Sequence, residues 1–371
     1  MLPRSASAQR PDDATFVVRL GRDTVAVERF TRRPTLLEGE RLVRFPRASL
    51  VRYTATLGPD GAITRFESTA VPLLTDSSIA SSTVVFGMDS VRVTLSTSQG
   101  TRSYAVNPQA AEASVYLPFS FALYEQLVRR TIGRGVDTAH AELVFPGVLN
   151  PLPTSIRRIG ADSAAIDFFG SPLYLRIDRA GRILGADGSA TTQKVTATRE
   201  RRADVVALAH AFAAREDAEG APGQLSPRDT ARATVGHAEI EIDYGRPSLR
   251  GRTILGQVVP WNEVWRTGAN AATGFTTTAD LAIGGVDVPA GSYSIYSIPG
   301  PAGAVLIVNR QTGQWGTEYD PELDVARIPL VQRTLDDPVE TFTITLEPAA
   351  NGAVLRLAWE RTEWTVTVAP R

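Results

Sequence analysis

The sequence predicts a mainly β protein in two parts. The N-terminal part is expected to be a curved antiparallel sheet with a packed helix, and the C-terminal part an antiparallel β-sandwich of the jelly-roll kind, with a linker helix between them. Short stretches of alternating apolar and polar residues follow one another along the 371 residues, separated by turns rich in glycine, proline and aspartate. Only two stretches show the apolar spacing that is typical of a helix.

The N-terminal part, residues 14–200, opens with two predicted hairpins. Their turns are Gly21-Arg22-Asp23 and Gly58-Pro59-Asp60-Gly61. Proline presets φ in such a turn, and glycine takes the positive φ that the turn requires. Further strands are predicted at residues 84–88, 90–96, 141–145, 155–159, 163–168, 173–178, 182–184 and 194–200.

The first predicted helix covers residues 118–130. Apolar side chains recur there at helical spacing, at Phe121, Tyr124 and Val128. Glu125 stands four residues before Arg129, which is the spacing of an ion pair along a helix. Gly133 is placed to end the helix.

The second predicted helix, residues 201–219, continues into a loop that reaches residue 225. Gly220-Ala221-Pro222-Gly223 ends this helix, so the segment 201–225 is expected to link two domains. From residue 226 to residue 371 the pattern is that of short strands. Apolar residues alternate with acidic ones at Ala238, Ile240, Ile242 and Tyr244.

Composition excludes several classes of protein. With 39 basic and 40 acidic residues the net charge is −1, which gives no electrostatic reason to expect nucleic acid as a partner. No run approaches the ~18 apolar residues of a transmembrane helix. Cysteine is absent, so disulfides and thiolate chemistry are excluded. Lys194 is the sole lysine, and clusters of the many arginines could bind carboxylates or phosphates in bidentate fashion.

Residues 1–13 precede the first predicted strand. Ala6-Ser7-Ala8 has the small-x-small pattern that signal peptidase accepts, although the basic and apolar regions of a signal peptide do not precede it. We expect the tail of a signal peptide, left by a start codon that is placed too late. The protein would then be exported to the periplasm or the cell surface. A disordered alanine- and serine-rich N-terminus is the alternative.

Several phrases lie in order over about residues 226–371, among them Ile242-Asp243-Tyr244-Gly245-Arg246-Pro247, Val264-Trp265-Arg266-Thr267-Gly268-Ala269-Asn270, Gly291-Ser292-Tyr293-Ser294-Ile295 and Tyr319-Asp320-Pro321. By these phrases the C-terminal part resembles a bacterial family of unknown function, DUF2911. The resemblance implies an exported or cell-envelope protein and no assigned activity. A glutamate often follows the Trp-Arg-Thr-Gly-Ala-Asn phrase in this family, where this sequence has Ala271.

The phrase around Arg266 supplies the candidate binding site. In one interpretation Arg266 and Asn270 line a pocket, and a tryptophan forms its stacking floor. In the other, which we favour, Trp265 lies in the core, Arg266 pairs with an acid such as Asp243 or Asp320, and Asn270 holds a loop. The candidate pocket residues are Asp243, Trp261, Trp265, Arg266, Asn270, Tyr319, Asp320 and Asp324.

No metal site is predicted, because the three histidines lie far apart and no His-x-x-x-His or cysteine spacing occurs. The histidines are His140, His210 and His237. Glu318, Asp320 and Asp324 could supply oxygen ligands to calcium, but they lack the alternate spacing of a calcium loop. The alternative is a solvated acidic loop.

No catalytic residue is assigned. The Gly-x-Ser-x-Gly elbow of the serine hydrolases is absent. A hydrolase with two carboxylates would need two acids that face one cleft, and Asp243, Glu263 and Asp320 could meet in this way.

We therefore expect a non-enzymatic exported module that binds a small polar ligand, a glycan or an envelope partner, without a cofactor. The alternative is a hydrolase of envelope glycans or lipids that uses paired carboxylates. A third interpretation is a purely structural envelope protein whose N-terminal sheet holds an apolar ligand.

Overall fold

The computed structural model describes residues 11–73, 80–110, 112–168, 171–191 and 193–371. The chain divides into two compact units, Met1–Gly223 and Gln224–Arg371. The first strand, β1 (Asp12–Leu20), begins two residues before the predicted start of the N-terminal part. The Ala6-Ser7-Ala8 pattern of the predicted signal-peptide remnant lies outside the described residues.

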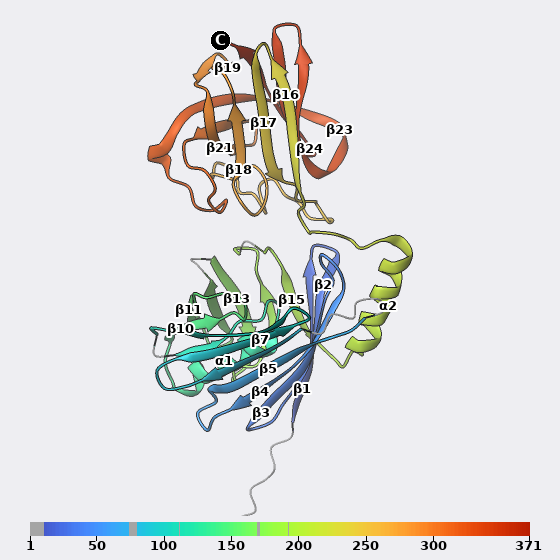
Figure 1. The fold of residues 1–371 in the computed structure, drawn as a ribbon, viewed down its shortest axis with the longest axis vertical. Helices are drawn as coiled ribbons and strands as arrows, with labels where there is room; N and C mark the ends of the chain where they lie inside the picture. Colours follow the sequence, from blue (N-terminus) through green and yellow to red (C-terminus); the bar gives the residue numbers. More distant parts are fainter. Residues whose placement is uncertain (1–10, 74–79, 111, 169–170, 192) are drawn as a thin grey trace, which may run out of the picture. The chain divides into compact units, whose positions relative to one another are not determined.

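In the described part of the N-terminal unit, 15 strands form one sheet (Figure 1). Neighbours in the sheet are consecutive in sequence, except where β1 pairs with β15. The pairs are antiparallel, apart from β9 and β10, which run parallel. The strands after β1 are β2 (Asp23–Arg32), β3 (Leu36–Val43), β4 (Ser49–Leu57), β5 (Ile63–Val71), β6 (Ser81–Phe86), β7 (Val91–Thr97), β8 (Gly100–Val106), β9 (Ala113–Val115), β10 (Thr138–Val144), β11 (Leu152–Arg158), β12 (Ser163–Phe168), β13 (Ser171–Ile177), β14 (Ile183–Asp187) and β15 (Thr196–Glu200).

Helix α1 (Phe121–Gly133) begins three residues later than predicted. Phe119 has a φ of 61°, in the left-handed region, and the N-cap residue Ser120 is extended, so the helix cannot begin at residue 118. The end also differs from the prediction, because Gly133 lies within the helix and Arg134 is the C-cap.

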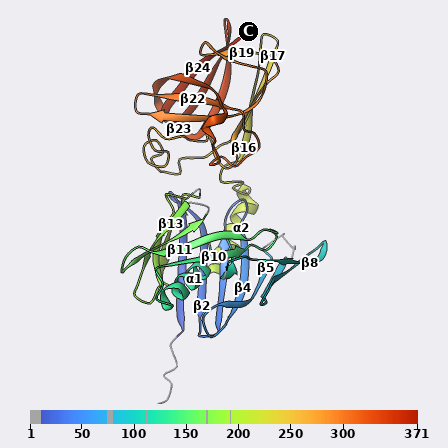
Figure 2. The ribbon, with the colours of Figure 1, turned by 90° about the vertical axis from the view of Figure 1, so that its left-hand side faces the viewer.

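Helix α1 is enclosed by the curved sheet (Figure 2). Its first eight residues, 121–128, are all buried, so the first two turns of the helix are covered on every side and not only along the predicted apolar stripe. Phe16 of β1 lies with its ring centroid 5.3 Å from that of Phe121 and 6.1 Å from that of Phe30 in β2. Aromatic side chains thus fill the space between α1 and the sheet.

Helix α2 (Val205–Glu219) packs on the opposite face of the sheet. Its buried residues Val205 and Ala209 join a core cluster with Val17, Val27 and Leu42, which alternate with the residues that face α1. The helix begins after Asp204, whose side chain accepts a hydrogen bond from Ala207 N, and not at residue 201 as predicted. Within the described residues, neither helix is long and apolar enough to cross a membrane.

The described part of the C-terminal unit forms nine strands, in the order β16-β17-β18-β21-β22-β23-β24-β19-β20. The 26-residue strand β23 pairs with β22 near its start and with β24 over the rest of its length, so it joins two layers around one core. The predicted mainly β, antiparallel class is confirmed. The elements are β16 (Arg228–Val235), β17 (Ala238–Gly245), β18 (Thr273–Thr277), β19 (Leu281–Ile283), β20 (Val286–Val288), β21 (Gly291–Gly300), β22 (Gly303–Asn309), the 3-10 helix η1 (Pro321–Leu323), β23 (Asp324–Ala349) and β24 (Gly352–Pro370).

Candidate functional site

A network of charged side chains lies between α1 and three neighbouring strands of the N-terminal unit. Asp12 of β1 is the register partner of Arg32 in β2, and Arg199 comes from β15 on the other side of β1. All three contact α1 or the residues bound to it. Asp12 Oδ1 accepts from Arg199 Nη2 at 2.8 Å, and Asp12 Oδ2 lies 3.4 Å from Arg32 Nη1.

Glu125 of α1 is the centre of this network and is fully buried, with 0% of its side chain exposed. One carboxylate oxygen binds Arg32 Nη1. The other accepts from Arg199 Nη1 at 2.5 Å and from the backbone N–H of Ile183 at 2.7 Å. Glu125 therefore turns towards the sheet, and Arg129, its predicted partner along the helix, instead reaches Asp12 Oδ2 at 3.5 Å. The predicted pairing assumed an exposed helix face, and this helix has no such face at Glu125.

A pocket of about 390 Å³, which we call the turn pocket, opens beside this network. It is formed where the β2–β3, β4–β5 and β13–β14 turns meet the side of α1. Gln126 of α1 fixes one wall, because its Nε2 donates to Gly61 O at 2.8 Å and its Oε1 accepts from Arg32 Nε at 3.0 Å. The lining residues are Asp12, Arg32, Arg33, Pro34, Leu57, Gly58, Pro59, Gly61, Gln126, Arg129, Ala180 and Arg182.

Positive charge exceeds negative charge around the turn pocket. Burial lowers the pKa of Arg129, and the neighbouring Arg32 guanidinium lowers it further. The charge of Arg182 is compensated by Asp178, because the hydrogen bond between them raises the pKa of Arg182. Counted with their ion-pair partners, five guanidiniums face four carboxylates, namely Arg32, Arg33, Arg129, Arg182 and Arg199 against Asp12, Glu38, Glu125 and Asp178.

The residues predicted from the sequence lie in the C-terminal unit, where they have different surroundings. Trp265 packs partly buried against the core, with ring centroids 5.0 Å from Phe342 and 5.7 Å from Trp359. Trp261 packs against the same core. Asp243 lies elsewhere, where its carboxylate accepts from Arg228 Nη2 at 2.7 Å.

Arg266 pairs with neither Asp243 nor Asp320. Its Nη1 donates to Asn270 O at 3.4 Å, and no ion pair of Arg266 occurs in the described part of the chain. Burial lowers the pKa of Arg266. The half-buried Arg266 guanidinium is therefore held by a loop carbonyl and not by a carboxylate.

The acidic residues near Tyr319 have structural partners. Asp320 caps η1 by accepting from Glu322 N at 3.0 Å. Asp324 accepts from Tyr319 OH at 2.8 Å and pairs with Arg327. Burial, together with the bond to Asp324, raises the pKa of Tyr319 to about 12. Throughout the described ranges, no three His, Cys, Asp or Glu residues lie close enough to hold a metal ion.

The turn pocket was not predicted from the sequence, because every candidate pocket residue came from the C-terminal part. One signal was present in β2. Glu28, Phe30 and Arg32 alternate on one face of that strand, and all three are buried. Charged residues that share the inward face with a phenylalanine indicate buried partners elsewhere in the chain.

Comparison with known proteins identifies only the C-terminal unit. Residues 226–368 match the model of a family described as "Protein of unknown function (DUF2911)", which confirms the resemblance found in the sequence phrases. No curated protein matches the chain.

Two solved structures are similar to parts of the fold. A DUF1089 family protein from Pseudomonas aeruginosa has 10% identity and a TM-score of 0.32, and the match covers 44% of this chain and 89% of that one. A β-barrel-like protein of DUF1849 from Brucella abortus has 10% identity and a TM-score of 0.35, with 52% and 96% covered. At these values neither similarity carries an argument about function.

Proposed function

We propose that this protein is a binding module whose N-terminal unit takes a small anionic ligand, a carboxylate or a phosphate, in the turn pocket. The observation that carries the proposal is that the positive charge of Arg129 is only weakly compensated. Its side chain is 32% exposed and lies beside the like charge of Arg32, and its ion pair in the described structure is a 3.5 Å contact with Asp12. An anion in the pocket would compensate this charge.

The arginines around the pocket divide into two groups by their exposure. Arg32 is covered, with 7% of its side chain exposed, and its bonds to Glu125, Gln126 and Ala122 O hold the wall. Arg129 and Arg182 remain accessible at the mouth. Guanidiniums present a planar fork that suits carboxylate and phosphate oxygens. A partly desolvated arginine on a rigid helix binds such a group at a smaller entropic cost than an exposed one.

The surroundings of Asp12, which lines the pocket, and of Glu125, which is buried beside it, favour binding over hydrolysis. A hydrolase with two carboxylates needs one of them to donate a proton to the leaving group. Asp12 contacts Arg32, Arg129 and Arg199, while Glu125 contacts Arg32 and Arg199. Both acids therefore accept hydrogen bonds from arginines in the described structure.

The experiment is calorimetric titration of the full chain with succinate and with inorganic phosphate at low ionic strength. We expect at least one of them to bind with a dissociation constant below about 1 mM, equivalent to about 4 kcal/mol. Arg129→Met keeps most of the aliphatic chain and removes the charge. It should weaken binding at least tenfold, since a hydrogen bond to a charged group contributes about 1.5–3 kcal/mol.

Arg65→Met is the matched control, because Arg65 is an exposed strand arginine paired with Glu67, outside the turn pocket. It should leave the affinity unchanged. If neither anion binds at about 10 mM, which is roughly ten times the expected upper limit of the dissociation constant, the proposal is contradicted. It is also contradicted if Arg129→Met and Arg65→Met weaken binding equally.

We further propose that the protein is exported, which rests on Ala6-Ser7-Ala8 before Gln9. In the native organism, the protein should be found in the periplasmic or cell-surface fraction. Mass spectrometry should show a mature N-terminus that follows the small-x-small pattern. An intact Met1 on protein recovered from the cytosol would argue against export.

A further inference from the structure

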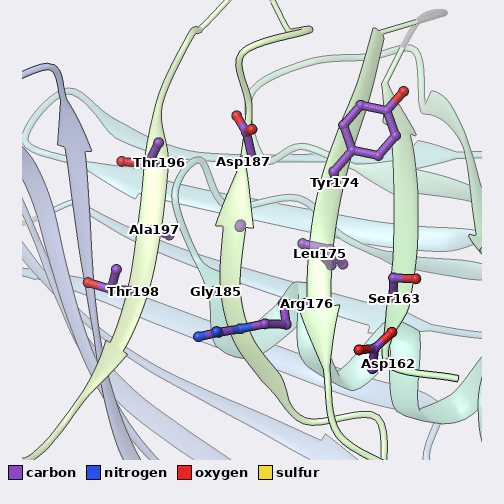
Figure 3. Close-up of a pocket in the computed structure, with 11 residues that line it drawn as sticks. Asp162, Ser163, Tyr174, Leu175, Arg176, Gly185, Asp187, Thr196, Ala197 and Thr198 are labelled. Atoms are coloured by element: carbon purple, nitrogen blue, oxygen red, sulfur yellow. The ribbon is translucent and has the colours of Figure 1, made fainter. Parts of the chain in front are cut away.

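A second pocket, of about 430 Å³, lies on the face of the N-terminal sheet that points away from α1 (Figure 3). It spans β12 to β15. Leu175 and Ala197 are buried towards the interior, and their strand neighbours Tyr174, Arg176 and Thr198 point outward into this pocket. We call it the outer-face pocket. The sheet separates it from α1 and from the charged network around Glu125.

The floor of the outer-face pocket exists because residue 185 is glycine. Arg176, Gly185 and Thr198 are register partners on three adjacent strands. The Arg176 side chain runs across β14 beside Gly185 (Figure 3). A Cβ atom at Gly185 would lie 3.8 Å from Arg176 Nη2 and 3.3 Å from Ala197 O. A side chain at this position would therefore occupy the floor of the pocket.

The neighbouring row of residues supplies an aromatic face and a carboxylate. Tyr174, Asp187 and Thr196 are register partners, and each lies two residues along its strand from Arg176, Gly185 and Thr198 respectively. Tyr174 is 44% exposed, although it is a large aromatic residue in the middle of a sheet. Asp187 is oriented by the backbone N–H of Ser189, which donates to Asp187 Oδ1 at 2.8 Å. Its second oxygen points to no described partner.

The guanidinium of Arg176 has no hydrogen-bond partner among the described residues. In the described part of the chain it takes part in no ion pair and no side-chain hydrogen bond, although Asp162 and Asp187 also line the pocket. Since the lining contains one guanidinium and two carboxylates, it does not favour either an anionic or a cationic ligand. These groups do offer planar donors and planar acceptors close to an exposed ring.

We propose that the outer-face pocket binds one residue of a neutral saccharide. The apolar C–H face of a sugar ring packs on an aromatic ring, here that of Tyr174. Neighbouring hydroxyls both donate and accept, so they match the Asp187 carboxylate and the Arg176 guanidinium together. Pockets with a few placed polar groups beside an aromatic wall are typical of small-ligand sites. The sequence led us to expect a small polar ligand, a glycan or an envelope partner, and of these the glycan is the ligand that we assign to this pocket. It is independent of anion binding in the turn pocket.

The test is calorimetric titration of the full chain with four neutral oligosaccharides. The probes are cellohexaose, maltohexaose, laminarihexaose and chitohexaose. At least one should bind with a dissociation constant below about 5 mM, a weak but specific affinity. Tyr174→Ala should weaken that binding at least tenfold, while Tyr174→Phe, which keeps the ring, should retain it. Gly185→Val should abolish binding by filling the floor. Valine suits a strand, and the φ of Gly185 lies outside the left-handed region.

The turn pocket provides a separate control. Arg129→Met should leave saccharide binding unchanged, and Gly185→Val should leave phosphate and succinate binding unchanged. The proposal is overturned if none of the four probes binds. It is also overturned if binding survives both Tyr174→Ala and Gly185→Val in proteins that show the wild-type circular dichroism spectrum, or if Arg129→Met removes it.

Discussion

The carboxylate of Glu28 in β2 accepts a hydrogen bond from the backbone N–H of Ala122 at 2.9 Å, so a strand residue caps the start of α1. Ser120, the N-cap residue by position, does not cap with its own side chain. Instead its hydroxyl donates to Glu28 at 2.5 Å, as does Tyr53 OH at 2.6 Å. The first turn of α1 is thus attached to the sheet through one buried carboxylate.

Glu28 gives a pH-dependent prediction. Burial raises its pKa above the usual 4.5, against the opposing effect of its hydrogen bonds. A group whose folded-state pKa is raised contributes stability that is complete below its unfolded pKa and is lost as the pH rises through the folded pKa. The glutamine side chain of the Glu28→Gln variant cannot ionise, so this variant does not lose stability in this way. The stability difference between wild type and Glu28→Gln should therefore shrink from pH 4 to pH 8.

Urea unfolding of both proteins across this range measures that difference. It should fall by about 1.4 kcal/mol for each unit by which the Glu28 pKa is raised. Effects of pH on the other groups are common to both proteins and cancel. A difference that grows with pH would show that Glu28 is stabilised as a carboxylate.

The buried pair of Glu125 and Arg32 gives a prediction of stability. Glu125→Gln leaves Arg32 and Arg199 without their buried partner, which typically costs about 3–5 kcal/mol. The matched control is Glu67→Gln, which breaks the exposed pair with Arg65 and should cost no more than about 1 kcal/mol. Denaturant unfolding compares the two. Equal, small losses would mean that the network contributes little to the folded state.

Arg266 is expected to contribute little to stability. Because its described bond is to Asn270 O and not to a carboxylate, Arg266→Ala leaves no buried acid unpaired. The loss in free energy of unfolding should be about 1 kcal/mol, as for a single modest hydrogen bond. Arg266→Met, which keeps the packing of the side chain, should cost less. A loss of about 3 kcal/mol or more for Arg266→Ala would reveal an acidic partner.

The C-terminal unit should fold by itself. Residues 224–371 enclose a core of their own that contains Phe342, Trp359 and Trp364. A fragment of these residues should therefore unfold in one cooperative thermal transition, with a blue-shifted tryptophan emission in the folded state. A fragment without a cooperative transition would show that the N-terminal unit is needed to complete the core.

From the sequence alone, the β class, the hairpin turns and the approximate positions of both helices could be predicted. These features are local. Alternation with a period of two marks a half-buried strand, and the turn at Gly58-Pro59-Asp60-Gly61 is encoded in four consecutive residues. The family phrases around Trp265 could also be recognised, since a phrase is a contiguous stretch of sequence.

The tertiary structure alone decided which charges meet. Asp12 and Arg199 are 187 positions apart, yet they lie 2.8 Å from each other because β1 and β15 are paired. The partner of Glu125 could not be found from helical spacing, since the sheet encloses α1 and buries the face that spacing alone would leave exposed. Likewise, Arg176, Gly185 and Thr198 form one floor only through strand register. Register depends on the packing of the whole sheet, and no local stretch of sequence contains it.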